Sequence, residues 1–159
     1  MTKFLLTVHV LAAIITIGPV TVAASMFPPS ARRALAAPDD AAALATVRTL
    51  HRICRVYAVI AVVVPVFGLA TANSLHVLGS PWLLTSIALT VAAAAVLAAL
   101  VLPRQSSVLA VLDGTDGVQE ATAIRRTAGQ LGMYTGVFNL LWATVTVLMI
   151  VRPGSTTGA

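Results

Sequence analysis

A single histidine, His9, lies well inside a long apolar stretch of the chain and is the residue there most suited to chemistry. Ionisable side chains are costly in hydrocarbon and usually face the interior of a bundle or a water-filled cavity. A neutral imidazole can ligate iron, which makes His9 a candidate ligand for haem b. The structural alternative is a histidine that is hydrogen-bonded to a neighbouring helix. We favour this alternative because a lone histidine lacks the additional ligands that complete a metal site.

The other histidines and the cysteine add little to a metal or haem site. His76 lies in a loop on the same predicted side as His9 and could complete a bis-histidine haem site, although loop histidines are usually solvated. His51 belongs to the opposite side and cannot join them. Cys54 is the only cysteine, which excludes an intramolecular disulfide and a cysteine-rich metal site, and no metal site is predicted. We interpret Cys54 as a small packing residue, with palmitoylation as the alternative.

Two further polar features accompany the apolar stretches. Arg48, Arg52 and Arg55 are spaced by four and three residues, which places them on one face of a helix. Such a face could bind the phosphate groups of lipids, but its expected role is to anchor the topology at the membrane surface. Asn139 carries an amide that is costly to leave unsatisfied in lipid, so we expect it to point to another helix. No catalytic constellation is evident.

The elements that must position these residues are four long apolar helices. Residues 4–31, 56–103 and 127–151 contain no Asp, Glu, Lys or Arg. A helix needs about 20 apolar residues to cross a hydrocarbon core of about 30 Å. The sequence therefore predicts an all-α polytopic membrane protein, an antiparallel four-helix transmembrane bundle. We expect the spans at about 4–26, 56–72, 82–102 and 129–151, within one domain at 1–152, and a disordered tail at 153–159.

Prolines and acidic residues indicate where these helices begin and end. Pro28 and Pro29 are expected to stop the first helix, and Pro103 is expected to close the third. Residues 105–128 are then expected to form a polar connection with turns at Asp113-Gly114 and Asp116-Gly117. The sequence Pro38-Asp39-Asp40 favours the start of a helix that runs without interruption into the second span.

The composition supports a membrane protein. Hydrophobic residues form 58% of the chain and charged residues 9%, against about 25% charged in soluble domains. The net charge of +5 does not indicate nucleic-acid binding, because the basic residues flank apolar segments and are not interleaved with aromatic residues.

The distribution of the basic residues predicts the orientation. Eight of the ten Lys and Arg residues fall in the first and third connections between apolar stretches: Arg32, Arg33, Arg48, Arg52, Arg55, Arg104, Arg125 and Arg126. Only Lys3 and Arg152 flank the opposite ends. Because cytoplasmic loops carry an excess of Lys and Arg, we expect both termini and the 73–81 loop to lie outside.

Three segments carry a pattern that extends over most of the chain. They are VHVLAAIITIGPV with His9, the second helix with Arg52, Pro65 and Gly68, and the fourth helix with Phe138-Asn139 and Val151-Arg152-Pro153. This pattern resembles a superfamily of small four-helix bacterial membrane proteins. The superfamily includes predicted integral membrane proteins of a domain-of-unknown-function family, copper-resistance D-type membrane domains and the membrane-bound protoporphyrinogen oxidase of haem biosynthesis.

The resemblance implies that His9 matches a haem b ligand of the oxidase branch. This chain departs from that branch because its third helix, which begins near Trp82, contains neither histidine nor lysine. Asn139 is also followed by Leu140 where that branch has an acidic residue. A redox enzyme needs a second axial ligand or a charge that orients its substrate. The resemblance therefore favours the branch of unknown function.

We interpret the chain as a non-catalytic accessory or structural component of a bacterial cytoplasmic membrane. Its expected partners are the lipid bilayer and either another membrane protein or a second copy, without nucleic acid. The first alternative is a membrane redox protein that binds haem b through His9. The second is a small transporter or lipid-binding protein, which rests on Pro19, Pro65 and the arginine face.

Overall fold

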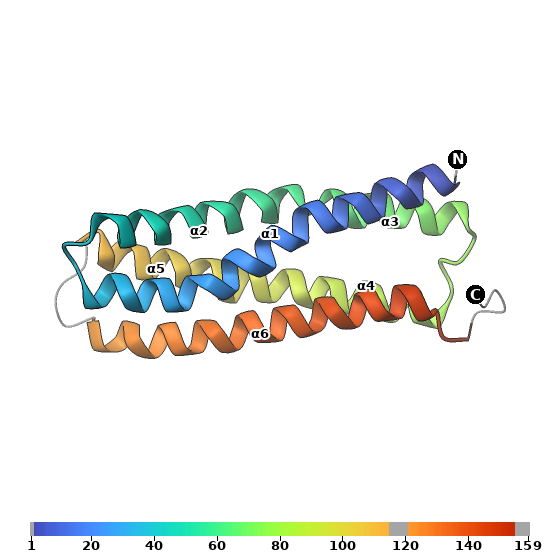
Figure 1. Cartoon of the computed structure of the whole chain (residues 1–159). Coiled ribbons are helices and arrows are strands. Elements are labelled where there is room, and N and C mark those ends of the chain that lie inside the picture. Colours follow the sequence, from blue (N-terminus) through green and yellow to red (C-terminus); the bar gives the residue numbers. More distant parts are fainter. Residues whose placement is uncertain (1, 115–120, 155–159) are drawn as a thin grey trace.

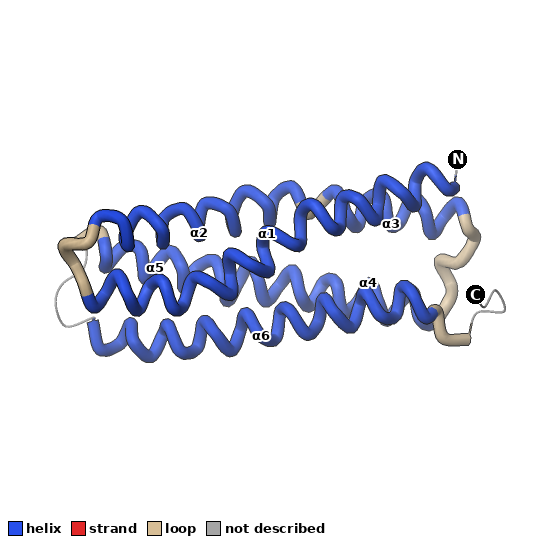
Figure 2. Tube along the Cα trace, in the orientation of Figure 1, coloured by secondary structure: helices blue, strands red, loops and turns tan. Residues whose placement is uncertain are grey.

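The computed structural model describes residues 2–114 and 121–154, and the side chains within these ranges except those of 121–126. Over these residues the chain forms helices joined by short loops (Figures 1 and 2). The elements are α1 Thr2–Ala36, α2 Ala41–Ile60, α3 Val63–Ser74, α4 Pro81–Ala95, the π-helix η1 Val96–Val101, α5 Leu102–Leu112 and α6 Ala121–Val151. The described part contains no strand, as the all-α prediction requires.

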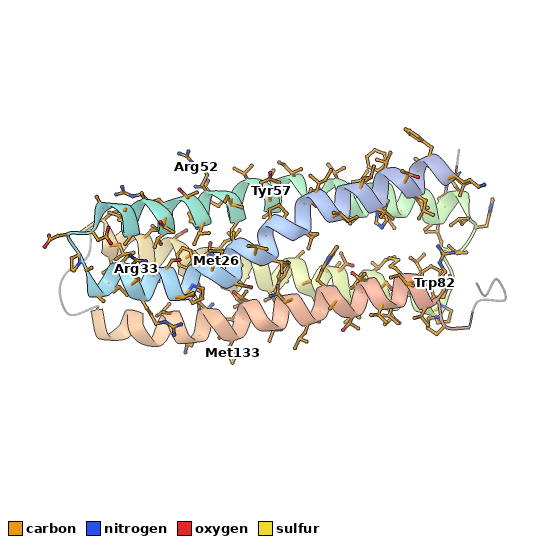
Figure 3. The ribbon with its side chains drawn as sticks, viewed as in Figure 1. Met26, Arg33, Arg52, Tyr57, Trp82 and Met133 are labelled. Atoms are coloured by element: carbon orange, nitrogen blue, oxygen red, sulfur yellow. The ribbon has the colours of Figure 1, made fainter. Side chains whose placement is uncertain are left out.

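The elements assemble into four rods that are long and apolar enough to cross a membrane, which confirms the predicted fold class. The rods are Thr2–Ala36, Ala41–Ser74, Pro81–Leu112 and Thr127–Val151. They run antiparallel, and the start of α1 and the end of α6, which we refer to as the chain ends, lie at the same end of the bundle as the α3–α4 connection (Figure 1). Arg33 and Arg52 lie toward the opposite end, whereas Trp82 lies near the chain ends (Figure 3).

The first rod continues through Pro28 and Pro29, so the expectation that these prolines end it is wrong. A proline inside a helix removes one N–H donor and crowds the carbonyl four residues earlier, at a cost of about 3 kcal/mol. Burial offsets this cost here, because Phe27 and Ala31 are fully buried and α1 packs against α2 along this segment. Transmembrane helices also tolerate proline where neighbouring groups satisfy the freed carbonyls.

The second rod is interrupted between Ile60 and Val63, and Pro65 explains the interruption. Pro65 has no N–H to donate to the carbonyl of Ala61, four residues earlier. That carbonyl instead accepts from the N–H of Val64 at 3.0 Å, which tightens the chain locally. Helix α2 reaches Ile60, inside the predicted second span, and α3 continues it end to end after the break (Figure 1). The predicted long helix is therefore present but interrupted.

The start of this rod was also predicted. Asp40 caps α2, and its Oδ1 accepts from the N–H groups of Ala42 at 3.0 Å and Ala43 at 3.1 Å. A carboxylate in this position satisfies backbone donors that have no partner within the helix and lies at the positive end of the helix dipole.

The third rod continues where Pro103 was expected to close it. In η1 the hydrogen bonds span five residues, and the N–H of Leu102 donates to the carbonyl of Leu97. Pro103 lies in the first turn of α5, where a missing N–H is tolerated. Residues 105–112 are consequently helical, and the prediction of a polar connection there is wrong.

The turn predicted at Asp113-Gly114 is present. Gly114 has a φ of 73°, a left-handed conformation that favours glycine, and its N–H donates to the carbonyl of Val111. The second predicted turn, at Asp116-Gly117, lies outside the described residues, as do residues 155–159 of the predicted tail. Helix α6 ends at Val151, where Arg152 leaves the helix with a positive φ of 44°.

Helix α1 contacts several other helices, because it crosses the bundle from α6 to α3 and also packs against α2 (Figure 1). Toward the α1–α2 loop it packs against α2 and α6, and toward the chain ends it packs against α3 while α4 packs against α6. The largest fully buried side chains are Phe27, Leu131, Gln105, Val20, Val47, Val101, Val108, Cys54 and Ser86. Most of the core therefore lies in the half of the bundle that is remote from the chain ends.

The outer surface is strongly apolar. Val59, Leu140 and Ile150 are each more than 70% exposed, at 74%, 71% and 75%. Helix α1 has 35 residues and is therefore about 52 Å long at 1.5 Å per residue, against a hydrocarbon core of about 30 Å. The bundle is thus long enough to project beyond the membrane at the end that carries the arginines.

Candidate functional site

His9 is hydrogen-bonded to the neighbouring helix. Its Nδ1 lies 2.9 Å from the carbonyl oxygen of Val64 on α3, and because a carbonyl can only accept, Nδ1 is the donor. With the Nδ1 proton used in this way, a neutral form of the ring would carry its lone pair on Nε2. The ring lies beside Gly68, where a Cβ would come within 2.9 Å of Cε1 of the imidazole. The absence of a side chain at Gly68 is what allows the histidine to fit between α1 and α3.

The proposed bis-histidine haem site would need His76 as its second ligand. His76 is exposed in the α3–α4 connection with a φ of 56°, and no hydrogen bond joins it to His9. Within the described ranges there is also no group of three or more His, Cys, Asp or Glu side chains that could hold a metal ion. His9 thus offers at most one nitrogen ligand, because its other nitrogen is engaged by Val64.

A buried polar cluster that the sequence interpretation missed joins α2 to α5. His51 Nδ1 lies 3.0 Å from Oε1 of Gln105, and Nε2 of the same amide contacts Sγ of Cys54 at 3.6 Å. Gln105 is fully buried and His51 is 9% exposed. We call His51, Cys54 and Gln105 the α2–α5 polar cluster. It ties two helices together because each buried donor finds an acceptor on the facing helix.

One sequence signal could have revealed this cluster. His51 and Cys54 are three residues apart and so share one face of a helix, and Gln105 lies between Val101 and Val108 at helical spacing. Reading Pro103 as a helix end removed Gln105 from the third helix and hid the pairing.

Arg104, beside this cluster, is held against Tyr134 of α6. Its Cζ lies 4.4 Å from the centre of the tyrosine ring, and Nη2 lies 3.5 Å from the tyrosine hydroxyl. Nη1 donates to the carbonyl of Leu100, inside the π-helix, at 3.1 Å. Such cation–π contacts contribute about 0.5–2 kcal/mol. Among the described residues, the guanidinium is therefore fixed by an aromatic ring and a backbone carbonyl, and no carboxylate takes part.

The three arginines of α2 do not act alike. Arg48 forms an ion pair with Asp113 at 2.6 Å, with both side chains substantially exposed. An exposed pair of this kind contributes about 0–1 kcal/mol. Arg52 and Arg55 are exposed, and neither side chain forms a hydrogen bond or ion pair with another described residue. Arg52 projects away from the bundle (Figure 3), as a topology anchor would.

Asn139 also reaches a neighbouring helix. Its Nδ2 donates to the hydroxyl oxygen of Ser25 on α1 at 3.2 Å. Its Oδ1 is buried without a partner among the described residues, and the same holds for Oγ1 of Thr135, one turn earlier on α6. The polar atoms at this contact between α1 and α6 are therefore only partly hydrogen-bonded within the described residues.

Three glycines of α6 have open space within the described bundle where a side chain would lie. A Cβ at Gly129, Gly132 or Gly136 would meet nothing within 4 Å, in contrast to Gly68. Gly129 and Gly132 are exposed, as is Ala143 further along the helix. At 100° per residue these four positions fall on one side of α6, next to Asn139. We call Gly129, Gly132, Gly136 and Ala143 the α6 glycine face.

A hollow of about 270 Å³ lies at the α1–α2 turn, lined by Ser30, Arg33, Asp40, Ala42, Ala43 and Thr46. Its carboxylate is already engaged in capping α2. The hollow contains no nucleophile paired with a base, so it offers no catalytic arrangement.

Comparison with known proteins gives one match. Residues 3–153 match a protein-family model described as "Predicted integral membrane protein (DUF2269)". No curated protein matches, and no solved structure matches. The family match covers all four membrane-length rods.

Proposed function

The chain belongs to the family of predicted integral membrane proteins DUF2269, and from that premise we propose that it is a non-catalytic packing component of a bacterial cytoplasmic membrane. In this role it binds another membrane protein or a second copy of itself through transmembrane helices. Its two chain ends lie outside the cell, and the arginine-bearing end faces the cytoplasm.

The use of the intramembrane polar groups carries this proposal. The side chains of His9, Asn139 and Gln105 each bond a neighbouring helix. A catalytic or transport site would instead present such groups to a cavity that a substrate can enter. Polar groups that connect helices are typical of a protein whose task is to hold a defined shape in lipid.

The α6 glycine face indicates where a partner helix would bind. A glycine within a helix costs about 1 kcal/mol relative to alanine. Gly132 and Gly136 are four residues apart, the spacing that lets two transmembrane helices approach closely. A Cβ at either position would meet nothing in the described bundle, so a close contact with a helix from outside the bundle would offset the cost of the two glycines.

Replacement of these glycines by leucine tests the proposal. We expect native mass spectrometry to detect a stoichiometric complex when the wild-type chain is extracted from its native membrane in mild detergent. Gly132→Leu with Gly136→Leu should release the monomer, because the leucines fill the space that the partner helix needs. Ala94→Leu, at an exposed position on α4, is the matched control and should leave the complex intact. A wild-type chain that is monomeric in native membranes would contradict the proposal.

A second candidate function is a membrane redox protein that binds haem b through His9. The observation in its favour is the hydrogen bond to Val64, which leaves the Nε2 lone pair free for a metal. The resemblance also matches His9 to a haem b ligand of the protoporphyrinogen oxidase branch, although the third and fourth helices of this chain depart from that branch. The contacts of His9 offer one axial nitrogen, Nε2, and the backbone of Gly68 lies beside the ring.

An absorption spectrum separates the two functions. His9→Asn keeps a donor near the position of Nδ1 and removes the free ring nitrogen. If haem binds, the wild-type chain expressed with haem precursor shows a Soret band that His9→Asn loses while remaining folded. Absence of the band from the wild-type chain would eliminate this candidate.

A further inference from the structure

In the orientation proposed above, the side chains of Arg104 and Tyr134 fall near the inner border of the hydrocarbon core. Tyr134 precedes the outer end of α6, at Val151, by 17 residues, which corresponds to about 25 Å of helix. The hydrocarbon core is about 30 Å thick. Arg104 lies on α5, and its side chain reaches back to the carbonyl of Leu100, so the charge lies closer to the membrane than its own Cα.

This placement is unusual because a long basic side chain near a helix end normally extends toward water. Here the guanidinium is held toward the membrane by the tyrosine ring, at 4.4 Å, and by the π-helix carbonyl, at 3.1 Å. A positive charge held at the border of the hydrocarbon requires a compensating negative charge.

No acidic side chain of the described residues supplies that charge. Asp113 pairs with Arg48, and Asp40 caps α2. Asp39 is exposed in the turn between α1 and α2. The remaining acidic residues, Asp116 and Glu120, lie outside the described residues. Within residues 2–114 and 127–154, Arg104 therefore has no carboxylate partner, and an anion that binds the described bundle can supply the charge.

The free donors of Arg104 suit a tetrahedral oxyanion. A guanidinium has five N–H groups in a planar fork. The described contacts engage one N–H of Nη1 and one N–H of Nη2. Nε donates to no described residue. At the other end of the bundle, Arg152 differs, because its Nε is engaged by the carbonyl of Met149 and its Cζ lies 5.7 Å from the ring centre of Trp82.

We propose that Arg104, held in place by Tyr134, binds a phosphate-bearing anion at the inner surface of the membrane. Two sources offer this chemistry, the headgroup of an anionic phospholipid and a soluble phosphate ester. Bidentate contact between guanidinium and phosphate adds geometric selectivity to charge attraction. The ring of Tyr134 fixes the plane of the fork before the anion arrives, which lowers the entropic cost of binding.

The test measures phospholipid binding to the purified chain, delipidated in mild non-ionic detergent, by native mass spectrometry. Phosphatidylglycerol is the anionic probe and phosphatidylcholine the neutral control. We expect the wild-type chain to bind phosphatidylglycerol about tenfold more tightly, as charge-assisted hydrogen bonds of 1.4 kcal/mol or more predict. Arg104→Gln should lose about this factor, and Arg104→Lys should retain only part of it. Arg52→Gln, the matched control on the same side, should change binding by less than about twofold.

A competition experiment with a soluble phosphate ester distinguishes the two sources of the anion. Displacement of phosphatidylglycerol by millimolar glycerol phosphate identifies a soluble ester as the occupant, and resistance to displacement identifies the lipid. Equal losses in Arg104→Gln and Arg52→Gln would overturn the proposal, because they indicate a diffuse basic surface. A wild-type chain without preference for the anionic lipid, and without affinity for glycerol phosphate, would also overturn it, and this result does not depend on the folding of any variant.

Discussion

The imidazole of His9 occupies the space that Gly68 leaves on the facing helix. A Cβ at position 68 would lie 2.9 Å from Cε1 of His9 and 3.2 Å from Nδ1. Because the same ring donates to Val64 at 2.9 Å, it can move little without breaking a hydrogen bond that has no replacement in lipid. The pair sets the distance between α1 and α3.

Gly68→Ala should therefore destabilise the bundle. Overpacking of a close contact costs about 1–3 kcal/mol. Unfolding of the protein in bicelles by a denaturing detergent measures this cost as a lower free energy of unfolding. Gly18→Ala on α1 is the control, since a Cβ there meets nothing within 4 Å and should be neutral or stabilising by up to about 1 kcal/mol. Adding His9→Ala to Gly68→Ala should recover part of the loss. Equal effects of the two alanine substitutions would contradict the assigned contact.

Gln105→Leu tests the α2–α5 polar cluster. The substitution leaves His51 Nδ1 buried without its acceptor, which costs about 1–3 kcal/mol in the free energy of unfolding. Ser106→Ala serves as control and should cost less than about 0.5 kcal/mol, because Ser106 is exposed and its oxygen lies 3.5 Å from His51 Nε2. A Gln105→Leu protein as stable as the wild type would show that the cluster is dispensable.

Cysteine labelling tests the orientation. In a Cys54→Ala background, Ser74→Cys lies at the end of the bundle with the chain termini and Thr46→Cys at the arginine-bearing end. A membrane-impermeant maleimide should label the first in intact cells and the second only after permeabilisation, because basic residues are retained in the cytoplasm. Labelling of Thr46→Cys in intact cells would reverse the assigned orientation.

Hydrophobicity alone was enough to predict the fold class. Three uncharged apolar stretches, of which the second is long enough for two spans, can satisfy their backbone groups in lipid only as helices, so the number and order of the helices follow from the sequence. The short turn at Asp113-Gly114 and the cap at Asp40 were also predictable, because each depends on neighbouring residues alone.

The helix ends near proline were not predictable from local rules. Pro28 and Pro103 both lie inside continuing rods, one supported by the buried Phe27 and the other by the preceding π-helix. Both compensations come from helix packing and backbone adjustment, which a single sequence does not display.

For the same reason, only some of the polar residues that connect the helices were predicted from the sequence. His9 and Asn139 were predicted because a polar residue within an apolar stretch is recognisable from the sequence alone. Gln105 and Tyr134 act through partners on other helices, so their importance becomes visible only in three dimensions.

Photo-crosslinking from the α6 glycine face in native membranes tests the central claim most directly. A photo-reactive amino acid at Ala143 would lie on this face, and one at Ala94, exposed on α4, would lie on another rod. We predict that irradiation joins the Ala143 variant to one membrane protein, or to a second copy, in near-stoichiometric yield, and that the Ala94 variant gives no such product. Crosslinks from Ala143 to lipid alone would contradict a packing role for this protein.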